Sequence, residues 1–129
     1  MASKRVNSSL EDYIEAIYTL SLKTDNIKSV DVARLLDVSK ASVSNAMDRL
    51  VNIGYITKSP YGSINITQLG IEKAKEIYKR HTLLKSFLIN VLGVNDETAE
   101  VDACKMEHQI SDETFKKLER YIQKLNLFN

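Results

Sequence analysis

One segment of this 129-residue chain, a helical pattern followed at once by two strand-like patterns, most constrains its fold. Residues 40–53 carry apolar side chains at helical spacing, and Gly54 is placed to end the helix. Residues 55–59 and 63–67 then alternate as strands do, with a Pro-Tyr-Gly turn between them. The sequence therefore predicts a helix over 40–53 and a β-hairpin directly after it.

A shorter helix is predicted before this one. Ser29 is placed to cap it, Asp37 and Val38 form the following turn, and Ser39 caps the helix over 40–53. Two short helices joined by a tight turn are the helix-turn-helix pattern, and a hairpin after the second helix is a wing. This order is typical of winged-helix proteins that bind DNA.

The second of these helices and the wing carry polar side chains suited to DNA. Hydroxyl groups let a helix approach a groove closely, Asn can bond adenine, and Arg can reach guanine or phosphate. A solvated helix face is the commoner explanation of such residues, and a net charge of +1 does not by itself argue for nucleic acid. The wing that follows is what favours DNA binding. The candidate DNA-binding residues are Ser39, Lys40, Ser42, Ser44, Asn45, Arg49, Lys58 and Tyr61.

The chain has only one proline and four glycines, so a mainly α fold is predicted, with the hairpin as its only sheet. The winged helix-turn-helix is expected at 1–70 and a helical domain at 71–129. The last helices carry more apolar surface than so small a lobe can bury, which favours a symmetric dimer. Further helices are predicted over about 9–22, 68–92 and 97–109, and from Ser111 onward.

Cys104, Glu107 and His108 lie at positions i, i+3 and i+4 of the helix predicted over 97–109. This spacing places the three side chains on one helix face. Thiolate, carboxylate and imidazole together form a donor set for a transition metal. The alternative is a buried cysteine beside an ordinary Glu–His pair.

Three more residues complete the candidate metal site. Asp12 and Glu15 are three apart on the first helix, although acidic residues are also favoured in a first turn by the helix dipole. His81 lies on the apolar stripe of the long helix, where a histidine is more often a core residue than a ligand. The chain's only cysteine and both of its histidines thus belong to one candidate set.

Composition and missing motifs argue against several other classes of protein. No apolar run approaches the roughly 20 residues of a membrane-spanning helix, and the first residues do not form a signal peptide, so a cytoplasmic protein is expected. A single cysteine excludes an intramolecular disulfide. The His-Glu-x-x-His motif, a Ser-His-Asp order and a phosphate-binding glycine loop are all missing, so an enzyme is not expected.

Taken together, these motifs resemble the diphtheria-toxin-repressor family of iron- and manganese-dependent transcriptional regulators. The similarity is closest to the short manganese-transport-regulator branch, which lacks an SH3-like domain. It implies an N-terminal winged helix, a helical metal-binding and dimerisation domain, and metal binding by the six residues already named. The segments that carry the resemblance are 12–18, 42–44, 69–70, 80–81 and 104–111.

The resemblance also makes the site a hybrid. Asp12 matches the manganese branch, where the iron branch has methionine, whereas Cys104 matches the iron branch, where the manganese branch has glutamate. At the ancillary site of the iron branch, Lys85 replaces a carboxylate and Glu100 replaces a histidine, so this second site is expected to be altered or lost. The implied cofactor is Mn²⁺ or Fe²⁺.

The implied mechanism is a clamp: a divalent cation neutralises clustered carboxylates, joins the two lobes and selects the homodimer that fits a double-stranded DNA operator. The implied function is repression of metal-uptake genes. Two alternatives stay open, a winged-helix regulator that responds to an organic ligand and a small metalloenzyme.

Overall fold

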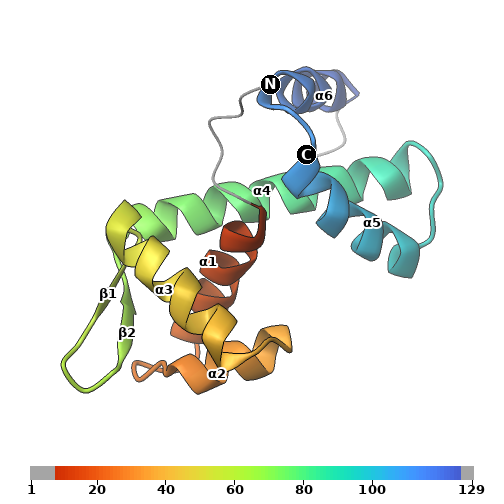
Figure 1. Ribbon diagram of the computed structural model, residues 1–129. Helices are drawn as coiled ribbons and strands as arrows, with labels where there is room; N and C mark the ends of the chain where they lie inside the picture. Colours follow the sequence, from red (N-terminus) through yellow and green to blue (C-terminus); the bar gives the residue numbers. More distant parts are fainter. Residues whose placement is uncertain (1–7, 126–129) are drawn as a thin grey trace. The chain divides into compact units, whose positions relative to one another are not determined.

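The computed structural model describes residues 8–125, with side chains from Leu10 onward. Its described residues divide into two compact units, 8–76 and 77–125, and the boundary lies within one long helix. The predicted mainly α fold with a small hairpin wing is confirmed (Figure 1). The elements in order are α1 (Ser8–Ser21), α2 (Ser29–Leu36), α3 (Lys40–Ile53), β1 (Ile56–Lys58), β2 (Ile64–Ile66), α4 (Gln68–Asn90), α5 (Asp96–Gln109) and α6 (Asp112–Lys124).

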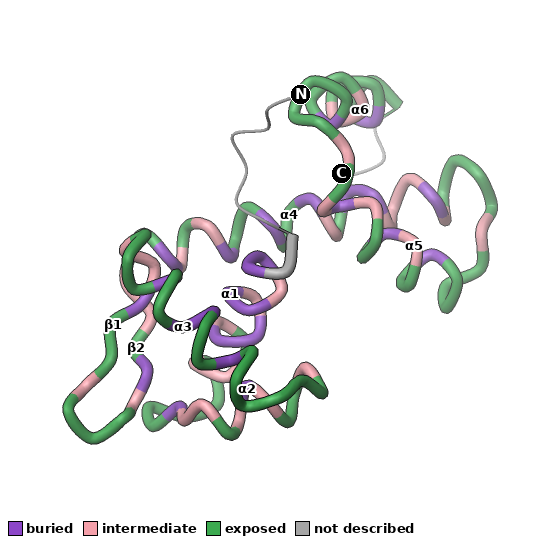
Figure 2. Tube along the Cα trace, viewed as in Figure 1, coloured by how far each residue is buried: buried purple, intermediate pink, exposed green. Residues whose placement is uncertain are grey.

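In the first unit, α1 packs against α2, α3 and β2. Its apolar face includes Ile14 and Ile17, both fully buried, and α3 contributes Met47 and Leu50 to the same core. Figure 2 shows the resulting concentration of buried positions along α1. Burial of large aliphatic side chains stabilises each by about 1.5–3 kcal/mol, so these contacts set the position of α3 relative to α1.

Local capping explains where these helices begin and end. The predicted Ser39 cap is confirmed: its hydroxyl accepts a hydrogen bond from the Ser42 amide at 3.1 Å. Gly54 ends α3 at φ +98°, a left-handed conformation that glycine adopts without strain. The predicted Ser29 cap is wrong by one residue. Lys28 is the N-cap of α2, because its amide donates to the Asp31 carboxylate at 2.9 Å.

The wing is a short antiparallel hairpin whose register pairs Ile56 with Ile66. Ile64 also pairs with a residue outside the hairpin, since its amide donates a hydrogen bond to the Ile27 carbonyl at 2.8 Å. Ile27, Ile56 and Ile64 are all buried, so the base of the wing belongs to the core. Only the turn around Tyr61, whose side chain is 87% exposed, extends into solvent.

In the second unit, the rest of α4 packs against α5 and α6. Ala99 and Ala103 of α5 are fully buried against Leu84 and Leu88 of α4. Phe115 of α6 joins a neighbouring apolar cluster. One boundary differs from expectation, because α4 ends at Asn90 rather than near residue 92.

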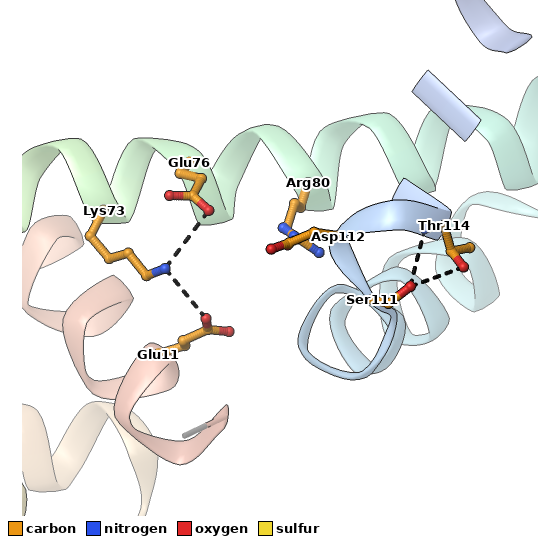
Figure 3. A network of polar contacts seen from close by, with 7 residues as sticks. All are labelled: Glu11, Lys73, Glu76, Arg80, Ser111, Asp112 and Thr114. Carbon is orange, nitrogen blue, oxygen red and sulfur yellow. Dashed lines mark hydrogen bonds and ion pairs between the residues drawn. The ribbon is translucent and has the colours of Figure 1, made fainter. Parts of the chain in front are cut away.

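Each unit also contains a buried charged residue with an opposite partner (Figure 3). Glu11, 1% exposed, lies 3.8 Å from the Lys73 ammonium in the first unit. In the second, the buried Arg80 guanidinium pairs with Asp112 and stacks over the Phe115 ring at 4.7 Å. A buried charge without such a partner is strongly destabilising. Among the helices of residues 8–125, none is long and apolar enough to cross a membrane.

Candidate functional site

His81 on α4 lies between two carboxylates of α5. Its Nδ1 is 2.6 Å from Glu107 Oε1, and its Nε2 is 3.0 Å from Glu100 Oε2. His108 Nε2 is 3.5 Å from the second oxygen of Glu107. Three of the residues predicted as metal ligands, His81, Glu107 and His108, are therefore neighbours in the second unit.

The packing of α5 explains why a carboxylate is buried here. The buried residues of this helix are Ala99, Ala103 and Glu107, which follow each other at intervals of four. The two alanines let α5 approach α4 closely, and Glu107, one turn further along the same helix face, is therefore also shielded from solvent. The Glu107 side chain is 1% exposed as a result, and His81 meets it from α4.

The electrostatics of this cluster favour a charged imidazole when no metal is bound. Hydrogen bonding to Glu107 raises the pKa of His81 to about 9, burial acts in the opposite direction, and Glu100 adds a smaller upward effect. A metal ligand must instead be neutral, so a cation at this position would displace a proton from His81.

Cys104 lies one turn before His108 on α5 and is exposed. The alternative that it is a buried core thiol is therefore wrong. Its role as a ligand stays a prediction. Imidazole, carboxylate and thiolate donors on facing helices fit a first-row transition metal by their chemistry.

Asp12 and Glu15 belong to the first unit, on α1, and both are partly buried. They share a helix face at i, i+3, beside the fully buried Glu11 and Ile14. Asp12 and Glu15 therefore belong to the helix that packs at the centre of the winged helix-turn-helix.

Two residues outside the predicted set also belong to the histidine cluster. Lys85 Nζ lies 3.0 Å from Glu100 Oε1, while the other oxygen of Glu100 contacts His81. The resemblance had marked Lys85 and Glu100 only as departures from an ancillary site. Lys85 follows His81 at i+4, a spacing that already placed both side chains on one face of α4.

The candidate DNA-binding residues all have exposed positions. On α3, Val43, Ala46 and Met47 are buried, so the polar side of the helix faces solvent. The hydroxyls of Ser39 and Ser42 are also hydrogen-bonded to each other at 3.0 Å within the helix cap. The wing presents Lys58 on β1 and Tyr61 at the turn.

This fold and this donor cluster define a winged-helix transcriptional regulator with a separate helical ligand-binding unit. Residues 6–64 match the N-terminal DNA-binding domain of iron-dependent repressors. Residues 67–127 match the metal-binding and dimerisation domain of the same family. The chain belongs to the iron-dependent repressor family, and the predicted resemblance to its short manganese-regulator branch is confirmed.

Similar proteins agree with this assignment. An HTH-type transcriptional regulator of Methanocaldococcus jannaschii is 40% identical over 121 residues, which are 92% of this chain and 96% of that protein. The transcriptional regulator MntR of Salmonella typhimurium is 37% identical over 105 residues, 81% of this chain and 66% of MntR. A solved structure of a manganese-dependent transcriptional repressor in complex with manganese has a TM-score of 0.77 and 25% identity, and the match covers 88% of this chain and 52% of that one. The chain thus spans about half the length of that repressor.

Proposed function

We propose that this protein is a transcriptional repressor whose binding to operator DNA depends on Mn²⁺ or Fe²⁺. The observation that carries the proposal is the grouping of His81, Glu107 and His108 on α4 and α5. It lies in the part of the chain that matches a metal-binding and dimerisation domain. Asp12, Glu15 and Cys104 are proposed as the remaining ligands, and 1–70 and 71–129 as the DNA-binding and the metal-binding and dimerisation domains.

Metal choice depends on competing donor types. Carboxylate oxygens suit Mn²⁺, whereas a thiolate favours Fe²⁺ over Mn²⁺. The similar repressor of known structure binds manganese. We propose that both Mn²⁺ and Fe²⁺ activate this protein and that Fe²⁺ binds more tightly, because it stands higher in the Irving–Williams order.

The position of α1 supplies the link between metal and DNA. Asp12 and Glu15 stand on α1, and α1 packs directly against α3, the proposed recognition helix. A bound cation would supply positive charge that offsets the negative charges of its carboxylate ligands. Any restraint on α1 is then passed to α3 through the buried core that includes Ile14 and Met47. Coupling between two such sites is typically worth about 1–3 kcal/mol.

The proposed partners are a second copy of the chain and double-stranded DNA. Two recognition helices of a dimer must enter major grooves about 34 Å apart, or a multiple of that distance. No catalytic role is proposed, and the similar proteins named above are described as regulators.

The test is operator binding measured against free Mn²⁺, Fe²⁺ and Zn²⁺, each without the others. Wild-type protein should bind tightly only with metal, and Glu15→Ala and His108→Ala should lose most of this dependence while retaining the circular dichroism spectrum. Glu97→Ala, which removes an exposed acid on α5, is the matched control and should behave as wild type.

Two outcomes would contradict the proposal. Equal operator affinity with and without metal would favour a regulator that senses an organic ligand. For that alternative, the apolar cavity of about 340 Å³ beside Tyr78 and Leu83 is the place to examine. A wild-type metal midpoint in Glu15→Ala or His108→Ala would remove that residue from the ligand set.

A further inference from the structure

A line of alternating charges continues from the histidine cluster to the surface. Lys85 Nζ is 3.0 Å from one oxygen of Glu100, and the other oxygen is 3.0 Å from His81 Nε2. On its far side, His81 Nδ1 meets Glu107 at 2.6 Å. His81, Lys85 and Glu100 line one surface cavity, so this line is reached from solvent.

The two carboxylates that meet His81 differ in their surroundings. Glu107 is 1% exposed, in contact with both histidines of the chain. The Glu100 side chain is 53% exposed, and each of its oxygens already has a partner, Lys85 on one side and His81 on the other. Glu107 is therefore suited to share a cation with an imidazole, whereas Glu100 is suited to hold the ring.

A histidine that binds a metal uses one ring nitrogen as donor and keeps a proton on the other. That second nitrogen is usually held by a carboxylate or a carbonyl, which sets the tautomer and the ring orientation. Of the two nitrogens of His81, Nε2 faces Glu100 and Nδ1 faces Glu107. The geometry matches this arrangement if Nδ1 is the nitrogen that binds the metal and Nε2 is the nitrogen that keeps the proton.

We propose that Glu100 and Lys85 are positioning residues for the metal site. Glu100 accepts the Nε2–H of His81 and leaves Nδ1 to bind metal beside Glu107, and Lys85 holds Glu100 in that orientation. This inference rests on the proposed function, because it takes His81 and Glu107 as ligands. It assigns Lys85 a role in metal affinity without making it or Glu100 a ligand.

Zn²⁺ is a suitable probe because it is diamagnetic and accepts the same donors. In long-range ¹H–¹⁵N spectra of the Zn²⁺-loaded wild type, His81 should show a protonated Nε2 and a metal-bound Nδ1, with His81→Gln and His108→Gln used for assignment. By calorimetry, Glu100→Ala should weaken Zn²⁺ binding about 10- to 100-fold at unchanged stoichiometry, as is usual when such a partner is lost.

Lys85→Met should weaken binding less than Glu100→Ala does, because Glu100 remains but is held less firmly. Two matched controls keep the measurement specific. Glu97→Ala removes an exposed acid from α5, and Lys75→Met removes an exposed base from α4. Both should stay within about twofold of wild type, whereas an outer partner of a ligand shifts affinity by tenfold or more.

Any one of the following results would overturn the inference. Metal bound through Nε2, or tighter binding or an added Zn²⁺ equivalent in Lys85→Met, would make Glu100 a ligand with Lys85 as its competitor. If Glu100→Ala binds Zn²⁺ as tightly as Glu97→Ala does, while His81→Gln binds it weakly, Glu100 is not a positioning residue. If His81→Gln itself binds Zn²⁺ as wild type does, the proposed ligand set fails too, and the two failures are thereby told apart.

Discussion

At the scale of single residues, the feature that most distinguishes this protein is charge placed where solvent is largely excluded. Glu107 and Glu11 are each 1% exposed and Arg80 is 4% exposed. Each has a partner of opposite charge or an imidazole: Glu11 pairs with Lys73, Arg80 pairs with Asp112, and Glu107 contacts His81. Removal of one partner from such a pair is expected to cost far more than removal of a surface charge.

The first prediction concerns pH and the metal-free protein. The pKa of His81 rises from 6.5 to about 9 on folding, chiefly through Glu107. Because the folded value lies above the unfolded one, the stabilisation is fully present below pH 6.5 and is lost as pH rises through about 9. The free energy of unfolding should fall over this window by up to about 3 kcal/mol more in wild type than in His81→Gln. Urea denaturation at several pH values measures it, and parallel curves would contradict it.

The second prediction concerns Cys104. If Cys104 is a metal ligand, as proposed, its thiolate favours Fe²⁺ over Mn²⁺. Cys104→Glu should then shift the ratio of the activation midpoints toward Mn²⁺, and Cys104→Ser should weaken activation by both metals. The readout is operator binding at controlled free metal. Because Cys104 is exposed, neither change should alter the fold. If Cys104→Glu leaves the Fe²⁺-to-Mn²⁺ ratio unchanged, the sulfur does not bind the metal.

At the scale of elements, hydrogen-bonded caps set where several helices begin. Ser39, Asn95 and Ser111 each accept a hydrogen bond from the backbone amide three residues later, at the starts of α3, α5 and α6. Such caps contribute about 1 kcal/mol each and set where the first turn begins. The Ser39 cap therefore helps to set which residues of α3 face the core and which residues face solvent.

The third prediction concerns the exposed face of α3. Asn45→Ala should weaken specific operator binding by roughly 1–3 kcal/mol if Asn45 contacts a base edge. Arg49→Ala should weaken binding to all sequences and reduce the salt slope by about one unit, as loss of a phosphate contact does. Salt titrations with operator and scrambled DNA distinguish the two effects. Unchanged affinity in both variants would exclude α3 from the interface.

The fourth prediction concerns the start of α4, which packs on the strand side of the winged helix. A Cβ at Gly70 would lie 2.2 Å from the Tyr55 carbonyl oxygen and 2.8 Å from Ile66 Cγ1. Since a backbone atom cannot yield easily, Gly70→Ala should lower the free energy of unfolding by about 1–3 kcal/mol or more. Lys75→Ala, at an exposed position of the same helix, is the control. Equal stability of both variants would show that the helix shifts without cost.

At the scale of the whole molecule, the chain consists of two compact units that share α4. The proposed ligands are divided between them, with Asp12 and Glu15 in the first and the other four in the second. Metal binding by this set would couple the DNA-binding unit to the unit proposed to form the dimer. The second unit also leaves Tyr78, Val101 and Tyr121 more than half exposed, which is apolar surface available to a second copy.

The fifth prediction follows for assembly. The protein should sediment as a dimer at micromolar concentration both with and without metal, because exposed apolar surface drives association independently of the cation. Val101→Lys and Tyr121→Lys should weaken the dimer if these residues line the interface. A monomer in both states would remove the basis for paired recognition helices.

The helix-turn-helix, the wing and the Ser39 cap of α3 follow from the sequence alone, because these features depend on residues within a few positions of each other. The sequence also carried the family resemblance and a set of six candidate ligands. Only the tertiary structure decided that Glu107 is buried against His81, 26 residues away, and that Glu100 and Lys85 continue the same line of charges. Such contacts depend on how closely α5 packs on α4, and the alanines at 99 and 103 decide that spacing through side-chain volume, which helical periodicity does not encode.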